Sequence, residues 1–376
     1  MRIVSLHSVN PGVKIGKTVT NDQGQVLVQE GVSLSERMIN RLKKLKITFV
    51  YIEDEESEGI EPVNAVSEET KANAIHEIKH AFGALAEAGN ISKSFILDRL
   101  GGNFKQTVTN ILKDARENDE AISLLTDTIG HDRYTFFHSL NVAIYSLAMA
   151  RELKLSPEEQ MTVGVGALLH DIGKTEVATS ILQKPDKLTD EEMIEMKKHP
   201  EYGFEILRKC HELSMVSAHC AYQHHERIDG KGYPRGIKGN DIHPYAKIIA
   251  VADVFGAVTS NRVYSKAILP HEAMELLFTG AETQFDLSII RAFRKTIAIY
   301  PVGLTVILND GRKALVVQQN KINSERPVIR IIEENHEKVV KPYYVDLNKE
   351  LAVTIVDTET TISGEERKLV NRFYYK

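Results

Sequence analysis

The amino-acid sequence predicts a mainly helical protein, in which a long helical region is flanked by a small N-terminal α/β module and a small C-terminal β domain. Across 67–298, apolar residues recur at three- and four-residue spacing, as on one face of a helix. Residues 13–52 mix short β-type runs with one helical pattern, and the pattern turns β-rich after 300. The length of 376 residues, with 42% hydrophobic content, is enough for several cores. The expected divisions are an N-terminal module, a linker with connector helices, a helical domain and a β-rich domain, at 1–60, 61–130, 131–300 and 301–376.

The N-terminal module is predicted to run strand, hairpin, strand, helix and strand. Asn21–Gly24 has the composition of a hairpin turn. Ser33 and Glu36 resemble a capping box, which would open a helix that continues through Leu45. The residues 53–62 that follow are strongly acidic and contain Gly and Pro, which is typical of a solvated linker. A domain boundary is therefore expected there.

The helical region is predicted to begin with connector helices. Ile75, Ile78 and Phe82 share one face of the first, and this face fits either dimerisation of two copies or packing against the remaining helices. Two loops, at 171–188 and 226–244, are rich in Gly, Pro, Lys and Asp. These loops are expected to hold the polar chemistry of the domain.

The C-terminal region shows β-type runs separated by turn residues such as Asn309–Gly311. This alternation predicts a small β domain. Its expected strands are 305–308, 314–318, 328–332 and 351–356.

Composition excludes several classes of function. A net charge of -5 and a pI near 6.3 argue against a nucleic-acid polymer as partner. No run of eighteen apolar residues and no leader-type N-terminus is present, so the sequence predicts a cytoplasmic protein without membrane insertion. Cys210 and Cys220 are too few for a disulfide framework and are expected to pack between helices.

Histidines and aspartates at helical positions suggest a metal site. The pair His170-Asp171 offers an imidazole nitrogen and a carboxylate to one ion, with a second oxygen for a neighbouring ion. His138 lies in an apolar stretch, where a hydrogen-bonded core histidine is the alternative. His224-His225 can share one ion only near a helix end. Asp253 interrupts an apolar run and needs a partner, a metal or an arginine, to offset its desolvation.

These residues together resemble the HD superfamily of metal-dependent phosphohydrolases, which are all-helical proteins. The run His224–Pro234 narrows the resemblance to the HD-GYP branch, the cyclic di-GMP phosphodiesterases of bacteria. The other matching segments are His170–Lys174, Lys198–Pro200, Asp253–Phe255 and Arg262–Tyr264. The resemblance covers about 125–300 and implies an HD-type all-helical catalytic domain.

The resemblance implies a centre of two divalent metal ions bridged by Asp171. The other expected ligands of one ion are His138, His170 and Asp253. Those of the second ion are His199, His224 and His225. Imidazole and carboxylate ligands without thiolates suit iron or manganese, and ligand type leaves zinc and nickel open. A hydroxide bridging the two ions would attack phosphorus in cyclic di-GMP.

The resemblance also implies contacts to the substrate. Lys174 and Arg262 would bind phosphate, and Lys174 would act with Asp171 in catalysis. Lys266 is a further expected phosphate contact. The glycine-rich loop that contains Tyr233 would form a wall of the substrate pocket or a surface for signalling proteins.

One position departs from the family pattern. Some HD-GYP proteins carry a Glu four residues before the first histidine, where it helps to bind a third metal ion, and here that position is Tyr134. The departure favours a binuclear site. Cyclic di-GMP is therefore expected to be hydrolysed mainly to the linear dinucleotide pGpG.

Three other functions remain as alternatives. The substrate could be another cyclic dinucleotide, such as cyclic GMP-AMP, or a nucleotide monophosphate, which a substrate panel would decide. The chain could be a receptor or scaffold that binds cyclic di-GMP with little turnover, although a pure binding module needs no complete set of metal ligands. A helical interaction protein, with histidines that only satisfy core hydrogen bonds, would require the motif matches to be coincidental.

Overall fold

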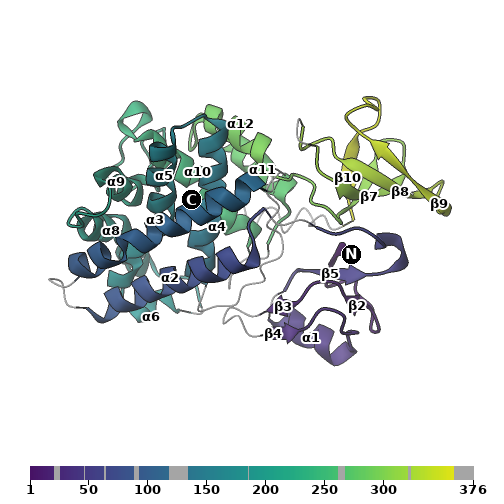
Figure 1. Cartoon of the computed structure of the whole chain (residues 1–376), viewed down its shortest axis with the longest axis horizontal. Helices are drawn as coiled ribbons and strands as arrows, with labels where there is room; N and C mark the ends of the chain where they lie inside the picture. Colours follow the sequence, from purple (N-terminus) through teal and green to yellow (C-terminus); the bar gives the residue numbers. More distant parts are fainter. Residues whose placement is uncertain are drawn as a thin grey trace.

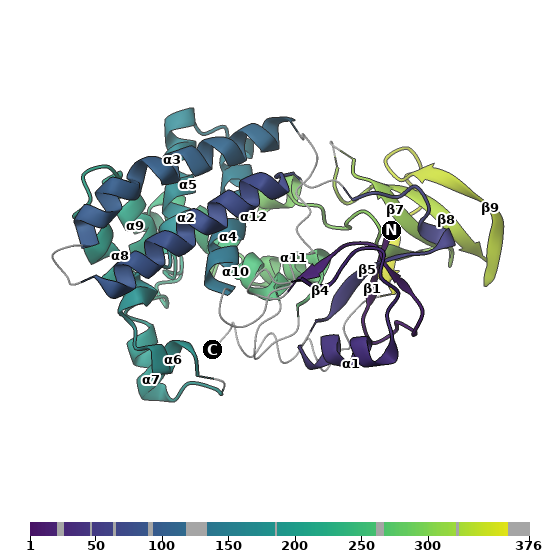
Figure 2. The same cartoon turned by 60° about the horizontal axis from the view of Figure 1, so that its bottom comes forward.

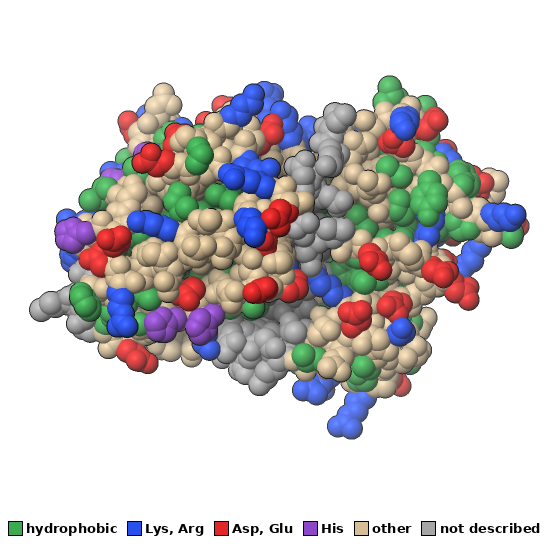
Figure 3. All heavy atoms as spheres, viewed as in Figure 1, with side chains coloured by type: hydrophobic (Ala, Val, Ile, Leu, Met, Phe, Trp, Pro, Cys, Tyr) green, Lys and Arg blue, Asp and Glu red, His purple; other side chains and the backbone are tan. Residues whose placement is uncertain are grey.

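The computed structural model confirms the predicted fold class, a helical domain flanked by a small α/β module and a small β domain (Figure 1). It describes residues 1–20, 26–45, 47–62, 65–88, 93–117, 134–184, 186–260, 267–320 and 323–359. The helices form one body, and the two smaller parts lie side by side next to it in both Figure 1 and Figure 2. On the face drawn in Figure 3, lysines and arginines are interspersed with acidic side chains and form no single broad basic surface.

The N-terminal module is a small sheet covered by one helix. Its three-stranded sheet has the order β1-β5-β2, and a separate hairpin pairs β3 with β4. The module core is apolar and buried, with Ile39 and Leu42 of the helix among its members. The elements are β1 (Arg2–Ser5), β2 (Lys14–Ile15), β3 (Val19–Thr20), β4 (Val26–Val28), α1 (Glu36–Lys44) and β5 (Phe49–Glu53). The predicted turn at 21–24 lies outside the described residues.

The predicted capping box of this helix is wrong by two residues. Ser35, not Ser33, is the N-cap, and its hydroxyl accepts from the backbone N–H of Met38 at 3.3 Å. Ser33 instead forms a β-bridge with Lys14, which holds it outside the helix. Leu45 caps the C-terminus and is 45% exposed, because the apolar face of the helix ends at Leu42.

The acidic segment 53–62 is not the solvated linker that its composition suggests. Residues Glu55–Ser57 form a 3-10 helix, η1, in which the side chains of Asp54 and Ser57 each accept from the backbone N–H of the other. Ile60 is 3% exposed and belongs to the core of the C-terminal domain. Asp54 and Glu56 are partly buried and pair with Arg2, and Ile60 anchors the segment in that core.

The helical domain shares one continuous core that extends from Ala65 to Ile299. Figure 2 shows α6 and α7 projecting away from the other helices. The first helices are α2 (Glu68–Glu87), α3 (Lys93–Glu117), α4 (Tyr134–Glu152), α5 (Pro157–Leu169), η2 (Ile172–Glu176), α6 (Thr179–Leu182) and α7 (Asp190–Met196). They are followed by α8 (His199–Leu207), α9 (Met215–Gln223), η3 (Gly239–Asp241), α10 (Pro244–Thr259), α11 (Pro270–Thr279) and α12 (Leu287–Thr296).

The connector helices pack against the other helices of the chain. Ile78 and Phe82 are buried in the common core, and Ile75 packs against it. The apolar face of α2 is therefore occupied within the chain, which leaves it unavailable for the dimer contact considered from the sequence. Both cysteines are buried and unpaired with each other, as expected for packing residues. Among the described helices, none is both long and apolar enough to span a membrane.

The C-terminal domain is a five-stranded antiparallel sheet with the order β10-β6-β7-β8-β9. The strands are β6 (Thr305–Leu308), β7 (Lys313–Gln318), β8 (Val328–Glu334), β9 (Glu337–Asp346) and β10 (Ile355–Thr358). The first three lie close to the predicted positions. The sequence pattern missed β9, because this edge strand is largely exposed on both faces and shows no alternation of apolar residues. The last strand begins four residues later than predicted.

The two flanking parts are joined by hydrogen bonds from both the backbone and a side chain. The N–H of Ile3 in β1 donates to the carbonyl of Gly303 at 2.8 Å, and Ile3 forms a parallel bridge with Leu304. Arg330 of β8 donates to the backbone carbonyls of Glu56 and Glu58. The N-terminal module and the β domain therefore share an interface although they lie at opposite ends of the described chain.

Replacement of Gly303 by Ala tests this interface. Gly303 has φ +87°, and a Cβ there would lie 2.9 Å from the Met1 carbonyl oxygen, so both backbone strain and a clash are expected. Gly311 is a matched control, because it has φ +84° with nothing near an added Cβ. Denaturant unfolding followed by circular dichroism should show a loss of about 1 kcal/mol for Gly311→Ala and about 2–4 kcal/mol for Gly303→Ala. Equal losses would contradict the packed interface.

Candidate metal centre

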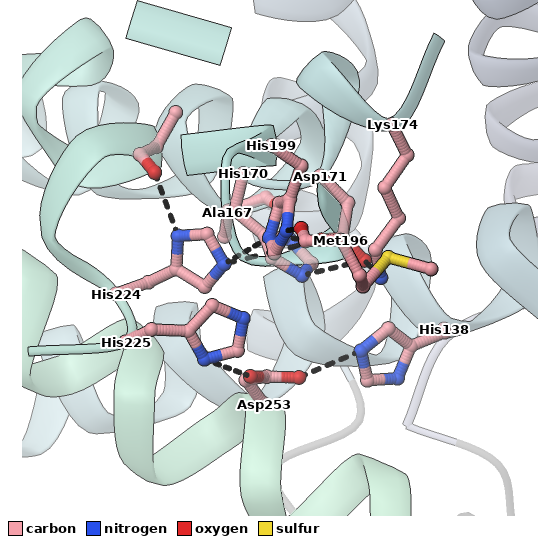
Figure 4. Close-up of polar contacts among 11 residues, drawn as sticks. His138, Ala167, His170, Asp171, Lys174, Met196, His199, His224, His225 and Asp253 are labelled. Carbon is pink, nitrogen blue, oxygen red and sulfur yellow. Dashed lines mark hydrogen bonds and ion pairs between the residues drawn. The ribbon is translucent and has the colours of Figure 1, made fainter. Parts of the chain in front are cut away.

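Seven histidine and aspartate side chains converge inside the helical domain (Figure 4). They come from α4, α10 and the ends of three other helices, so residues far apart in the sequence meet in one place. Six of the seven are at most 7% exposed, and the side chain of His225 is 24% exposed. The seven are His138, His170, Asp171, His199, His224, His225 and Asp253, which are the ligands expected from the sequence.

The convergent side chains form two groups that could each hold a metal ion. In each group, one donor atom per residue lies within 4.8 Å of the donor atoms of the others. One group contains His199, His224 and His225, and the other contains His138, His170 and Asp171. Two neighbouring sites of this kind suit a pair of ions.

The Asp171 carboxylate lies between the two groups. Its Oδ2 is 3.4 Å from Nε2 of His170, and its Oδ1 is 3.3 Å from Nε2 of His199. Asp253 has a similar position on the opposite side, with Oδ1 2.8 Å from Nε2 of His138 and Oδ2 3.8 Å from Nδ1 of His225. Each carboxylate thus offers one oxygen to each group.

Backbone carbonyls fix the orientation of three imidazoles. Nδ1 of His170 lies 2.7 Å from the carbonyl oxygen of Ala167, and the same contact to a carbonyl three residues earlier occurs at His199 and His224, at 2.8 Å each. A carbonyl can only accept, so Nδ1 carries the proton in each ring. The Nε2 lone pairs therefore point into the centre, as metal ligation requires.

These lone pairs make the centre suitable for cations. Nε2 of His199 and Nε2 of His224 are 3.3 Å apart, and neither can donate to the other when both Nδ1 atoms are protonated. Nε2 of His170 is buried and has no hydrogen-bond partner among the described residues. Imidazole and carboxylate donors are those that first-row divalent metals accept. The residues present therefore fit a metal pair.

The protonation states of His224, His225 and Asp171 agree with this donor set. Burial lowers the pKa of His225 to about 3, and burial together with neighbouring imidazoles holds the pKa of His224 well below its ordinary value. Burial alone would raise the pKa of Asp171, but Lys174 and the adjacent imidazoles outweigh burial and hold that pKa well below its usual range. Burial alone would lower the pKa of His170, but the carboxylates of Asp171 and Asp253 outweigh burial and raise it, so a metal ion that binds this imidazole must displace its proton.

A glycine lets the Asp171 turn approach α8. A Cβ on Gly173 would lie 2.0 Å from the carbonyl oxygen of His199 and 2.3 Å from the backbone nitrogen of Gly203. Any side chain at this position would push α8 away from η2. The glycine thus allows His199 to approach Asp171.

The glycine-rich loop folds back over the group formed by His199, His224 and His225. The N–H of Tyr233 donates to the carbonyl of His225 at 3.2 Å, and the two rings stack with centroids 4.6 Å apart. Glu226 accepts from the N–H of Arg235 at 2.9 Å, so it helps to fix the loop. Tyr233 therefore forms a wall beside His225.

Comparison with known proteins assigns the helical domain. Residues 113–289 match the family described as HD domain, and residues 305–365 match the KOW domain associated with HD domain. The chain belongs to the HD domain family. This assignment implies divalent metal binding, in agreement with the two groups of ligands in the HD domain.

Three curated relatives of this HD protein are phosphodiesterases by name. Cyclic di-GMP phosphodiesterase PA4108 of Pseudomonas aeruginosa is 34% identical and covers 72% of the chain. The 3'3'-cGAMP-specific phosphodiesterase 3 of Vibrio cholerae is 36% identical and covers 48% of the chain. The cyclic di-GMP phosphodiesterase response regulator RpfG of Xanthomonas campestris is 43% identical and covers 37% of the chain. The chain in turn spans 66%, 39% and 37% of their lengths.

The expected substrate contacts of the HD domain are only partly described. Lys174 lies beside the centre, with Nζ 2.6 Å from Oδ2 of Asp171, and Tyr233 stacks on a predicted ligand. Arg262 and Lys266 lie outside the described residues. Tyr134 is the first residue of α4, and its side chain is also outside the described part.

Sequence reasoning missed two features of the HD centre. The first is the set of carbonyls from Ala167, Met196 and Ala221, which no side-chain pattern can show because every residue has a carbonyl. The second is Lys197, whose ammonium lies 5.3 Å from the centre of the Tyr233 ring. The sequence offers one signal for Lys197, which is its position two residues before the predicted ligand His199.

Replacement of Asp171 by Asn tests the shared carboxylate of the HD centre. The amide keeps the shape but removes the charge between the groups, so bound metal should fall from about two ions per chain to less than one. The loss of affinity should exceed the about 10- to 100-fold that removal of an outer-shell partner costs. Plasma mass spectrometry of dialysed protein gives the metal content. Asp310→Asn, in a surface turn of the β domain, is the control, and two ions retained by Asp171→Asn would contradict the bridging role.

Proposed function

We propose that this HD protein is a phosphodiesterase that hydrolyses cyclic di-GMP, mainly to pGpG. The observation that carries the proposal is the pair of histidine groups joined by the Asp171 carboxylate. Curated relatives named for cyclic di-GMP or cyclic GMP-AMP hydrolysis support a cyclic dinucleotide as the substrate class. Because the chain spans only part of these relatives, the activity is inferred from the site.

The proposed cofactor is a pair of iron or manganese ions. His138, His170 and Asp253 would hold one ion with Asp171, and the three histidines 199, 224 and 225 would hold the other. When bound, such ions supply positive charge for the phosphate and lower the pKa of a coordinated water. The carbonyl-fixed imidazoles of the chain keep their Nε2 atoms directed at these ions without reorganisation.

Lys174 is the proposed phosphate-binding residue of the reaction. Its ammonium lies against Asp171, and its side chain is 26% exposed, so it can contact both the carboxylate and an incoming anion. A charge-assisted hydrogen bond from Nζ to a non-bridging oxygen would stabilise the negative charge that accumulates as the ester bond breaks. Tyr233, on the side of His225, would shield this region from water.

The proposed end product follows from Tyr134. A carboxylate at this position would add a ligand for a third ion, and this chain has a phenol instead. A binuclear centre has no additional ion for a second hydrolysis, so pGpG is expected to accumulate ahead of GMP. Cyclic GMP-AMP is the second candidate substrate, because a relative at 36% identity is named as specific for it.

Turnover by the anaerobically purified protein tests the proposed reaction. With iron or manganese present, chromatography should show cyclic di-GMP converted to pGpG faster than pGpG is converted to GMP. Chelation of the metal, or the double substitution His170→Ala with Asp171→Ala, should lower the rate at least about 100-fold. Asp310→Asn should retain full activity. If cyclic GMP-AMP is hydrolysed faster, the substrate assignment changes, and tight binding of cyclic di-GMP without turnover would favour a receptor.

Replacement of Lys174 by Met tests the phosphate contact. The change removes the charge but keeps most of the side-chain length, and kcat should fall about 10- to 100-fold. Lys184→Met is a matched control, because Lys184 has the same side-chain exposure of 26% but pairs with Glu192 on the projecting helices. Metal content is measured in parallel. Loss of metal from Lys174→Met would mean that Lys174 serves to stabilise the Asp171 carboxylate and not the substrate.

A further inference from the structure

Lys197 places an unpaired ammonium at the edge of the metal centre. It follows the last residue of α7, is exposed, and its Nζ lies 5.3 Å from the centre of the Tyr233 ring. Within the part of the chain that the structure describes, no carboxylate forms an ion pair with it. The two neighbouring lysines differ, since Lys174 pairs with Asp171 and Lys198 pairs with Glu195, each at 2.6 Å.

The backbone that carries Lys197 is fixed on both sides. Its own N–H donates to the carbonyl of Met193 at 3.0 Å. The preceding carbonyl, of Met196, accepts from Nδ1 of His199 at 2.8 Å. The same short turn therefore positions the predicted ligand His199 and the backbone of Lys197. A large movement of one would displace the other.

The Tyr233 ring lies between the Lys197 ammonium and the group formed by His199, His224 and His225. The Tyr233 ring stacks on the His225 ring with centroids 4.6 Å apart, and it meets the His199 ring edge to face at 6.5 Å. Lys197 thus lies one aromatic ring away from two predicted ligands, too far to bind the same metal ion and close enough to contact a molecule bound there. An exposed cation–π contact contributes only about 0.5–1 kcal/mol, so the ammonium can leave it for a stronger anionic partner.

The substrate class of the proposed function supplies such a partner. A cyclic dinucleotide has two phosphodiesters in one ring, and only one of them can lie at the metal pair for cleavage. The second keeps its negative charge and lies some distance from the metal ions. A charge-assisted hydrogen bond with a lysine ammonium stabilises an anion of this kind.

We infer that Lys197 binds the phosphate of the cyclic dinucleotide that is not cleaved, and so favours cyclic dinucleotides over phosphodiesters with a single phosphate. This role rests on the proposed function. It differs from the role of Lys174, because Lys174 contacts the Asp171 carboxylate whereas Lys197 lies beyond the Tyr233 ring. Lys197 is a substrate-binding residue and takes no part in the bond-breaking step.

Substitution of Lys197 tests whether this residue contacts the phosphate that is not cleaved. Cyclic di-GMP and bis(p-nitrophenyl) phosphate, which has one phosphodiester, are compared as substrates of wild type and Lys197→Gln. For cyclic di-GMP, KM should rise about 10-fold with kcat changed less than about two-fold, because one charge-assisted hydrogen bond is lost in both ground state and transition state. For the single-phosphate substrate, both constants should stay at the wild-type values.

Two further variants serve as controls. Lys198→Gln removes the same charge from the adjacent residue, which is bound to Glu195, and should leave KM for both substrates unchanged. Lys197→Arg keeps the charge and should restore KM to within about three-fold of wild type. Unchanged metal content of Lys197→Gln will show that the fold and the metal centre are intact.

The outcomes distinguish failure of this inference from failure of the proposed function. An equal rise of KM for both substrates, or no rise for either, would overturn the assignment of Lys197. If wild type cleaves bis(p-nitrophenyl) phosphate but not cyclic di-GMP, the proposed function fails. In that case, inhibition of bis(p-nitrophenyl) phosphate cleavage by cyclic di-GMP gives the inhibition constant Ki for cyclic di-GMP. A Ki about 10-fold weaker in Lys197→Gln supports the contact, and equal values in the two proteins refute it.

Discussion

A carboxylate buried between two groups of imidazoles requires positive charge close to it, and the geometry of the HD domain meets this requirement at Asp171. Removal of such a group from water costs several kcal/mol unless charges and hydrogen bonds compensate it. Lys174 supplies one positive charge at 2.6 Å. Metal ions held by the converging side chains would supply more. The donors come from five separate parts of the helical domain, so the helices must pack closely for the carboxylate to be stable in its ionised form. The common core of the domain provides this packing.

The ends of helices orient the ligands and also complete their own hydrogen bonding. The last four carbonyls of a helix have no partner within it. Ala167, Met196 and Ala221 lie in the last turns of α5, α7 and α9, and each of their carbonyls accepts from the Nδ1 of a histidine three residues later. One hydrogen bond thus satisfies the helix terminus and fixes the tautomer of the ligand. This explains why His170 and His224 lie just beyond α5 and α9, and why His199 lies at the junction of α7 and α8.

The sequence predicts the helical domain and all seven convergent residues, and it fails where tertiary contacts decide local structure. Resemblance to the HD-GYP pattern identified the residues, whereas periodicity alone could not show that they meet. Ser33 looked like a helix cap because its spacing to Glu36 fits the motif, but pairing with Lys14 holds it in a bridge. The acidic segment looked solvated because Ile60 is a single apolar residue among charges, and its burial depends on a domain that begins about 240 residues later. Carbonyl contacts leave no trace in a sequence.

The C-terminal β domain is linked to the metal centre by continuous packing. Leu269 immediately precedes α11, is fully buried, and belongs to the core of the β domain and not to that of the helices. Helix α11 packs against α10, and α10 carries Asp253, which contacts both groups of ligands. The N-terminal module is attached to the same β domain through Ile3 and Arg330. The start of α11 is therefore one packed connection between the flanking parts and α10. Because packed helices shift as rigid units, a displacement passed along this connection would change the position of Asp253.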